Sequence, residues 1–320
     1  MRWKRGSRLR LINESEASPR TREILGEIRD RLGAPVIPRL YQAYAVFPEF
    51  LELHWQSFRP MVESRQFFLL GARLAAECYT RAHNYFAVEN LAGRDVESAV
   101  EVTLPLAQVV DYYQYLNPLL LLITAAQMQA FEGASGEPGN DVDNAHHASF
   151  PVAPRLLNDE EATPAVQRIW GERRRILELA FVSDEHRALA CWPGFYQPYW
   201  AALKDLLQSP LYADCQYRMG ESAFKLARDL PITTETSIPQ LSDAGLDDEQ
   251  LSSLVRVNEA FMQAFTGLLL DVTFARIGLD GGTHKEEGKS GEAAEKPVAS
   301  EKPVQSERPV KQASTPTRAA

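Results

Sequence analysis

Apolar residues recur along most of this chain at every third or fourth position rather than at alternate ones, and strong helix formers dominate. This spacing places the apolar side chains on one face of a helix and predicts an all-α protein. In the first part, helices are expected at about Pro19–Leu32, Arg39–Val46, Pro48–Phe58, Gln66–Ala87 and Leu104–Phe131. Further on, they are expected at about Pro164–Ala180, Asp184–Cys191, Pro193–Leu207, Tyr212–Arg228 and Asp247–Ile277.

The second set of helices repeats the first. A shift of 145 residues superposes 11 of the 41 positions from 24 to 64 on identical residues without a gap. Further along, with a shift of 149, Leu119–Leu121 falls on Leu268–Leu270. We therefore interpret the chain as two copies of one helical unit. Each copy has one long apolar helix that is hard to bury alone, so the copies are expected to pack about a pseudo-twofold axis.

Composition divides the chain into five parts. The first residues are rich in Arg and Lys, whereas the last forty hold repeats of the form EKPV and too little apolar surface to offset the entropy of the chain. The expected parts are a basic flexible arm (1–20), a first helical repeat (21–131), a linker rich in Gly, Pro, Asn and Asp (132–154), a second helical repeat (155–278) and a disordered tail (279–320).

Charge, cysteine content and the length of the apolar runs indicate which partners and which cellular compartment to expect. The net charge is −9 although the arm is basic, so the helical body is acidic and is not expected to bind nucleic acid. Three cysteines stand far apart with no Cys-x-x-Cys, which suits a reducing compartment, by default the cytoplasm. The strongest apolar run, Leu116–Ala126, is shorter than the ~20 residues that span a bilayer, so a buried helix and no membrane contact are expected. We expect a homodimer formed through the long helices.

Four polar residues, from Ser183 to His186, open the stretch SDEHRALACWP, whereas the first copy holds Pro, Arg, Leu and Tyr at the same places. Duplicated halves usually share structural residues and differ at a site, so this cluster is a candidate site that faces Arg39 of the first copy. Helix capping is the competing interpretation: Ser183 or Asp184 would be the N-cap of a helix that starts at Glu185. Spacing alone favours capping.

Other motifs argue against several chemistries. His146 and His147, near Asp141 and Asp143, lie on the linker and give no fixed ligand geometry, so no metal is expected. No Gly-rich phosphate loop and no Gly-x-Ser-x-Gly motif occurs, so no nucleotide or other cofactor is expected. The aromatic stretch that starts at Trp192 is mainly a set of core anchors, although its density also suits the wall of a pocket.

The chain resembles the group I 2-haloacid dehalogenases, an all-helical family of two tandem repeats. The resemblance rests on FPEFLELHW, WPGFYQPYW, SDEHRALACWP and YLNPLLLLIT, and it spans about Thr21 to Ile277. It implies an active site between the repeats, where an Asp after a Ser activates water. That water displaces halide from C2 of a small 2-haloalkanoate without a covalent ester, so either enantiomer reacts with inversion. By resemblance, Asp184 after Ser183 is the base.

This sequence departs from the family pattern near the implied site. One extra residue separates the Ser-Asp pair from the frame that follows, so Glu185 is an alternative base to Asp184. The family's Asn after the frame Pro is missing from 184 to 215, and Gln197 is the nearest amide. The remaining candidates to orient or bind substrate are Val36, Arg39, Asn117 and Trp192.

Arg39 has two possible roles in this scheme. It would bind a substrate carboxylate as a bidentate pair, or it would neutralise Asp184.

Three functions remain open from the sequence. The first is hydrolytic dehalogenation of a small carboxylate substrate. The second is an inactive family member that binds a small carboxylate or apolar ligand between the repeats, and the third is a structural or partner-binding protein. A base in a cavity has a raised pKa, whereas a capping carboxylate has a lowered one, and this difference separates the first two.

Overall fold

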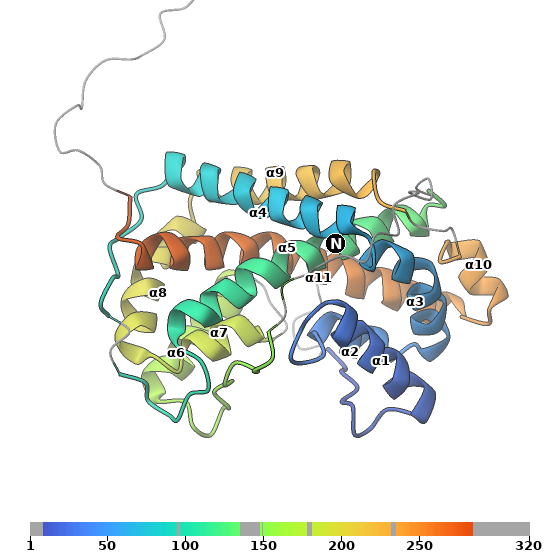
Figure 1. Ribbon diagram of the computed structural model, residues 1–320, viewed down its shortest axis with the longest axis horizontal. Helices are drawn as coiled ribbons and strands as arrows, with labels where there is room; N and C mark the ends of the chain where they lie inside the picture. Colours follow the sequence, from blue (N-terminus) through green and yellow to red (C-terminus); the bar gives the residue numbers. More distant parts are fainter. Residues whose placement is uncertain are drawn as a thin grey trace, which may run out of the picture. The chain divides into compact units, whose positions relative to one another are not determined.

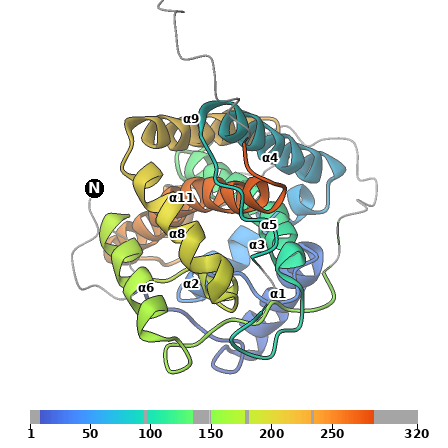
Figure 2. The same ribbon diagram turned by 90° about the vertical axis from the view of Figure 1, so that its left-hand side faces the viewer.

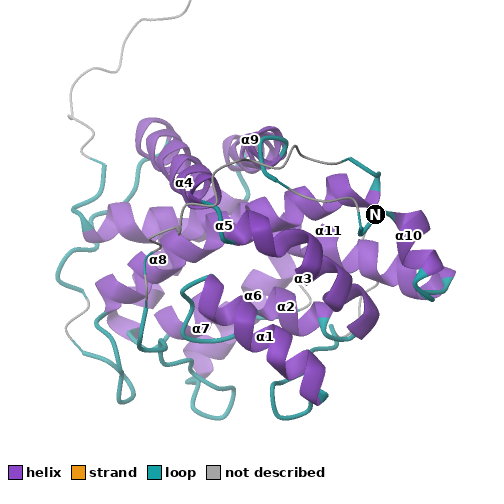
Figure 3. Ribbon diagram, turned by 45° about the vertical axis from the view of Figure 1, so that its right-hand side comes forward, coloured by secondary structure: helices purple, strands orange, loops and turns teal. Residues whose placement is uncertain are grey.

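The computed structural model describes residues 9–94, 97–134, 148, 150–177, 181–231 and 235–283. Contacts divide the chain into residues 1–284 and 285–320, and every described residue lies in the first unit. The regular structure of the described residues is helical, without a strand (Figure 3), which confirms the all-α prediction. The helices are α1 (Pro19–Arg31), α2 (Arg39–Tyr44), α3 (Pro48–Val62), α4 (Arg65–Tyr85), α5 (Leu106–Phe131), α6 (Pro164–Ile176), α7 (Asp184–Leu189), α8 (Pro193–Leu207), α9 (Pro210–Ala227), α10 (Ile238–Asp243) and α11 (Asp248–Leu279).

Four long helices form the centre of this unit. α5 and α11 cross its middle and make the most extensive contact between helices, while α4 and α9 lie over them (Figures 1 and 2). The segment 116–127 of α5 and the segment 264–275 of α11 are buried throughout. α11 is long and apolar enough to cross a membrane, but 78% of its most apolar window lies inside the protein, as in a core helix.

Two of the short helices pack against a long helix from the other part of the chain. α2, from the first part, packs on α11, and α7, from the second part, packs on α5. α1 to α4 and α6 to α9 begin at positions that differ by 145 residues, the shift that relates the two sequence copies. Local signals account for this agreement, because Ser64 and Ser209 each cap the following helix through their side-chain oxygen. Duplication and the pseudo-twofold axis remain predictions from the sequence.

Some boundaries differ from the expected ones. α10 was not expected, although Ser237 and Gln240 form a capping box at its start. α11 continues past Gly278 to Leu279. The described part of the arm lies against the helices, since Ile12 N–H donates to Gln42 C=O at 3.0 Å.

Gly71 of α4 lies close against Leu119 of α5. A Cβ at Gly71 would lie 2.4 Å from Leu119 Cδ2. We expect Gly71→Ala to lower the free energy of unfolding by about 1–3 kcal/mol, because Leu119 must shift in a packed core. Denaturant titration measures the change.

Gly26→Ala is the matched control for this substitution. Its Cβ would meet nothing within 4 Å, and Gly26 lies inside α1. Alanine there should raise the free energy of unfolding by about 0.5–1 kcal/mol through helix propensity. Equal effects of the two substitutions would contradict the packing argument.

Candidate active site

A cavity of about 40 Å³ lies where α2, α5, α7 and α11 meet. On the same scale one water molecule needs roughly 10–15 Å³, so the cavity suits a few waters or a small organic molecule. Its walls are mainly apolar. The residues that line it are Val36, Pro38, Arg39, Tyr112, Tyr113, Leu116, Asn117, Leu120, Phe181, Ser183, Asp184, Glu185, Phe261, Ala264, Phe265 and Leu268.

Ser183 is the N-cap of α7 and also lines the cavity. Its hydroxyl oxygen accepts the backbone N–H of His186 at 3.4 Å, so the capping interpretation is right for Ser183. The cap fixes the first turn of α7, and the two acids that follow it are adjacent in that turn. The same serine therefore has a structural role and a place in the cavity wall.

Asp184 forms an ion pair with Arg39. Arg39 Nε donates to Asp184 Oδ1 at 2.5 Å, and the side chains are 24% and 18% exposed. The two residues are 145 apart, so equivalent positions of the two sequence copies face each other here. The Arg39 guanidinium also lies 5.9 Å from the ring centre of Phe181. These contacts hold the cation at the more exposed side of the cavity wall.

Glu185 is almost completely buried, with 1% of its surface exposed. Its Oε2 accepts a hydrogen bond from Asn117 Nδ2 at 2.7 Å, whereas its Oε1 has no partner among the described residues. Burial and then the negative charge of Asp271 raise the pKa of Glu185 well above its ordinary value, and Arg173 and the Asn117 amide oppose this rise only in part. The raised pKa is the property expected of a base in a cavity.

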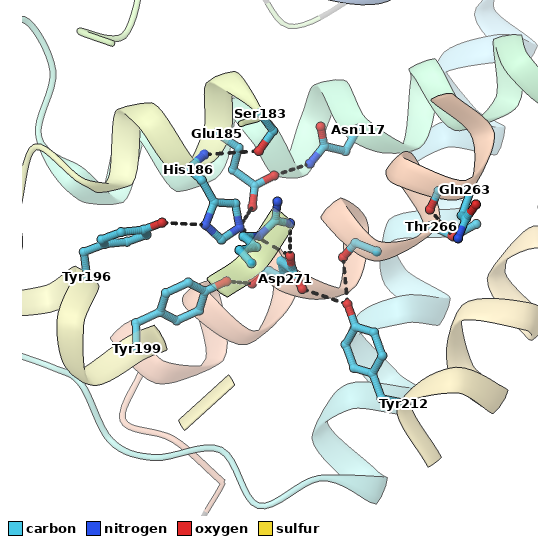
Figure 4. Close-up of polar contacts among 12 residues, drawn as sticks. Asn117, Ser183, Glu185, His186, Tyr196, Tyr199, Tyr212, Gln263, Thr266 and Asp271 are labelled. Carbon is cyan, nitrogen blue, oxygen red and sulfur yellow. Dashed lines mark hydrogen bonds and ion pairs between the residues drawn. The ribbon is translucent and has the colours of Figure 1, made fainter. Parts of the chain in front are cut away.

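A second buried carboxylate, Asp271, lies behind Glu185 (Figure 4). His186 Nε2 lies 3.3 Å from Asp271 Oδ2 and 3.9 Å from Glu185 Oε1. On its other side, His186 Nδ1 lies 3.0 Å from the hydroxyl of Tyr196. Burial and then Arg173 lower the pKa of His186 to about 4, so the imidazole is neutral at neutral pH.

Arg173 and two tyrosines complete the surroundings of Asp271. Arg173 Nη2 donates to Asp271 Oδ2 at 2.5 Å, and the hydroxyl of Tyr212 donates to Oδ1 at 2.8 Å. Tyr199 donates to the main-chain oxygen of Asp271 at 2.7 Å. Sequence reasoning missed Arg173 and Asp271, although a lone acid inside the apolar run LLLDVTFA is a usable signal.

The sequence is similar to those of several known proteins. A family model described as halocarboxylic acid dehydrogenase DehI matches residues 35–186. The chain is 22% identical over 273 residues to an (R)-2-haloacid dehalogenase of Pseudomonas putida, a match that covers 83% of this chain and 91% of that protein. An (R)-2-haloacid dehalogenase of Rhizobium sp. (strain NHG3) is also 22% identical, over 70% of this chain and 88% of the relative.

Solved structures agree in fold. A D-2-haloacid dehalogenase in complex with L-LA has a TM-score of 0.75, 22% identity, and coverage of 87% of this chain and 99% of that one. A mutant D-2-haloacid dehalogenase in complex with D-2-CPA has a TM-score of 0.74, 21% identity, and coverage of 86% and 97%. The chain is similar to the 2-haloacid dehalogenases in sequence and shares their fold.

Two of the residues expected at the site lie elsewhere. Gln197 is exposed on α8, because the buried face of that helix is formed by its neighbours Tyr196 and Tyr199. Trp192 is buried in the core at the start of α8 and does not line the cavity. The amide at the acid therefore comes from Asn117 of α5, which the sequence also named.

Among the described residues no group of three His, Cys, Asp or Glu side chains could hold a metal ion. The four linker residues considered for a metal site, namely Asp141, Asp143, His146 and His147, lie outside the described residues. The cysteines Cys78, Cys191 and Cys215 are buried and free.

The raised pKa of Glu185 leads to a prediction about stability. The folded protein keeps this proton above the ordinary value of 4.5, so its contribution to stability is complete below about pH 4.5 and is lost as pH rises through the folded pKa. Glu185→Gln, which carries no titrating proton, should therefore become increasingly more stable than the wild type as pH rises from about 5 to 9. Thermal unfolding across this range measures the gap.

Glu172→Gln provides a control of opposite sign. The hydrogen bond from Lys204, followed by that from Trp200, lowers the pKa of Glu172, so its contribution is present at neutral pH and is lost on acidification. This variant should be less stable than the wild type at neutral pH, with a gap that closes as pH falls. A stability difference between Glu185→Gln and the wild type that does not change with pH would contradict the raised pKa of Glu185.

Proposed function

We propose that this protein hydrolyses small 2-haloalkanoic acids, with Glu185 as the general base for a water that attacks C2. The observation that carries the proposal is the state of the Glu185 carboxyl group. One oxygen accepts a hydrogen bond from Asn117, the other has no hydrogen-bond partner among the described residues, and the residue lines a small, mostly apolar cavity. The relatives' name, (R)-2-haloacid dehalogenase, supports the substrate class and suggests the (R) enantiomer.

The proposed reaction needs one proton acceptor and one site for the leaving halide. Water oxygen forms a bond to C2 as the carbon–halogen bond breaks, the halide leaves with the bonding electrons, and the water proton passes to Glu185. A carboxylate in an apolar cavity is a stronger base than one in water, because burial disfavours its charge. The attack occurs on the face opposite the halogen, so the product has inverted configuration.

Tyr112 is suited to receive the halide. It lines the cavity, and its buried hydroxyl has no hydrogen-bond partner among the described residues. Burial raises its pKa, so the hydroxyl keeps its proton and remains a donor. A preplaced O–H donor in an apolar wall stabilises the charge that develops on the leaving halogen.

Arg39 is suited to bind the substrate carboxylate. Its Nε is taken by Asp184, which leaves the two terminal nitrogens able to form a bidentate pair. In this arrangement Asp184 orients the guanidinium and offsets part of its charge. Both roles considered for Arg39 are then compatible, and Asp184 is a positioning residue rather than the base.

Binding without turnover is the second candidate function. Arg39, the cation at the cavity, is already paired with Asp184, and the walls are mostly apolar. Both features favour a small apolar ligand. Halide release separates the two candidates directly.

The first test is halide release from (R)- and (S)-2-chloropropionate and 2-bromopropionate by the purified protein. We expect release with the (R) substrates, and Glu185→Gln should lower kcat by roughly 10²–10⁴-fold, the usual contribution of a general base. Asp184→Asn, the neighbouring isosteric change, should raise KM and keep most of kcat. The opposite ranking would make Asp184 the base, and no release by folded protein would favour binding without turnover.

A second test distinguishes water attack from attack by the carboxylate itself. With enzyme in excess, one turnover of (R)-2-bromopropionate in ¹⁸O-water should place ¹⁸O in the product hydroxyl and none in the protein. Inversion should give (S)-lactate. Unlabelled product with ¹⁸O in Glu185 would indicate a covalent ester and overturn the proposed mechanism.

A further inference from the structure

The ion pair between Arg173 and Asp271 is buried in the core of the protein. Arg173 is 2% exposed and Asp271 is fully buried, and the pair connects α6 to α11 across 98 residues of sequence. Arg173 Nε has no hydrogen-bond partner among the described residues, so the pair is not fully satisfied. Burying two charges in this way commonly stabilises a protein no more than apolar residues of similar volume would.

The first sequence copy fills the equivalent positions with apolar residues. The shifts of 145 and 149 that relate the copies place Ile28 opposite Arg173 and Leu122 opposite Asp271. Ile28 and Leu122 are fully buried in the core. Packing at this place in the fold therefore does not require an ion pair, and the pair calls for a reason other than stability.

His186 connects this pair to the candidate base. Its Nε2 lies between Asp271 Oδ2 at 3.3 Å and Glu185 Oε1 at 3.9 Å, and Tyr196 holds the opposite nitrogen (Figure 4). The neutral imidazole donates from Nε2 to Asp271 when Tyr196 donates to Nδ1. His186 and Glu185 are consecutive in the single turn that Ser183 caps, so fixing the imidazole also fixes the acid.

We propose that Arg173, Asp271 and His186 form a positioning unit that holds Glu185 in place and sets the charge around it. This inference rests on the proposed function, in which Glu185 is the base. None of the three residues lines the cavity, so they act through Glu185 rather than on the substrate.

The two charges of the pair act on Glu185 in opposite directions. Asp271 disfavours the ionised carboxylate and Arg173 favours it, while the Asn117 amide also favours it. The ionisable groups that face Glu185 are Arg173 on α6, His186 on α7, Tyr196 and Tyr199 on α8, Asp271 on α11 and Tyr113 on α5. Asp184 and Arg39, at the cavity wall, neutralise each other. Asp271 and Arg173 are thus the charges whose removal should change the pKa of Glu185 most.

The test compares the acidic limb of the kcat profile in single-charge variants. Asp271→Asn should move the limb to lower pH by about one unit or more, and Arg173→Leu should move it to higher pH. Tyr212→Phe, which removes a hydrogen bond to Asp271 but no charge, is the matched control and should leave the limb in place. A merely structural role predicts loss of stability without opposite shifts, and limbs that stay in place would overturn the proposal.

A second readout needs no turnover. The stability gap between each background and its Glu185→Gln derivative, followed against pH, reports the pKa of Glu185 in that background. The pKa of Glu185 obtained in this way should fall in Asp271→Asn and rise in Arg173→Leu. If the wild type releases no halide, the proposed function fails, while this linkage measurement still decides the positioning unit.

A double variant covers the case in which the single variants do not fold. Arg173→Ile with Asp271→Leu copies the first sequence copy and leaves no charge unpaired, so it should fold and be as stable as the wild type. We expect its kcat to fall by up to about a hundredfold with little change in KM, because His186 and Glu185 are no longer held. A double variant with the wild-type kcat and pH limb would overturn the proposal.

Discussion

A carboxylate that leaves water for an apolar core must either be paired or keep its proton, and this constraint organises the structure around the site. Asp271 takes the first course. Burial alone would raise its pKa, but Arg173 and His186 outweigh burial and lower it. Glu185 takes the second course, because one amide is its only described hydrogen-bond donor and its neighbour Asp271 is negative. The two acids are therefore complementary: the paired one remains charged and makes the other a stronger base.

The arrangement of helices makes this pairing of roles possible. α7 is a short helix that packs on α5 of the other half, so its first turn brings Glu185 against Asn117. Consecutive residues of a helix point about 100° apart, which explains why adjacent acids differ so much. Asp184 lies at the cavity's more open side and meets Arg39 from α2, whereas Glu185 turns into the core. The exchange of short helices between the halves thus builds one site from both.

The sequence predicted much of this, and its failures have physical reasons. Helix positions follow from periodicity and from caps such as Ser64, and the acids Asp184 and Glu185 stood out because the first copy has Arg and Leu at the equivalent positions. Asp271 was missed because its partner lies 98 residues away, and no local pattern connects them. Gln197 was placed at the site as the amide nearest in sequence to the family's missing Asn, but the face of α8 that it occupies points to solvent. Local sequence signals determine where helices begin and end, whereas the burial of a side chain and its pairing with a distant residue depend on how the helices pack.

The raised pKa of Glu185 has a consequence for catalysis that the geometry of the base alone does not supply. A carboxyl group that favours its proton accepts one from water more readily, yet a smaller fraction of it is ionised and ready to do so at a given pH. The two effects oppose each other, and the most effective base has a pKa close to the working pH. Asp271 adds to the rise of the Glu185 pKa that burial causes, whereas Arg173 and Asn117 oppose it, so the two charges of the buried pair adjust this pKa in opposite directions. A core with Ile and Leu at the same two positions would pack as well but would leave Glu185 without this adjustment, and the second half of the chain differs from the first at this point.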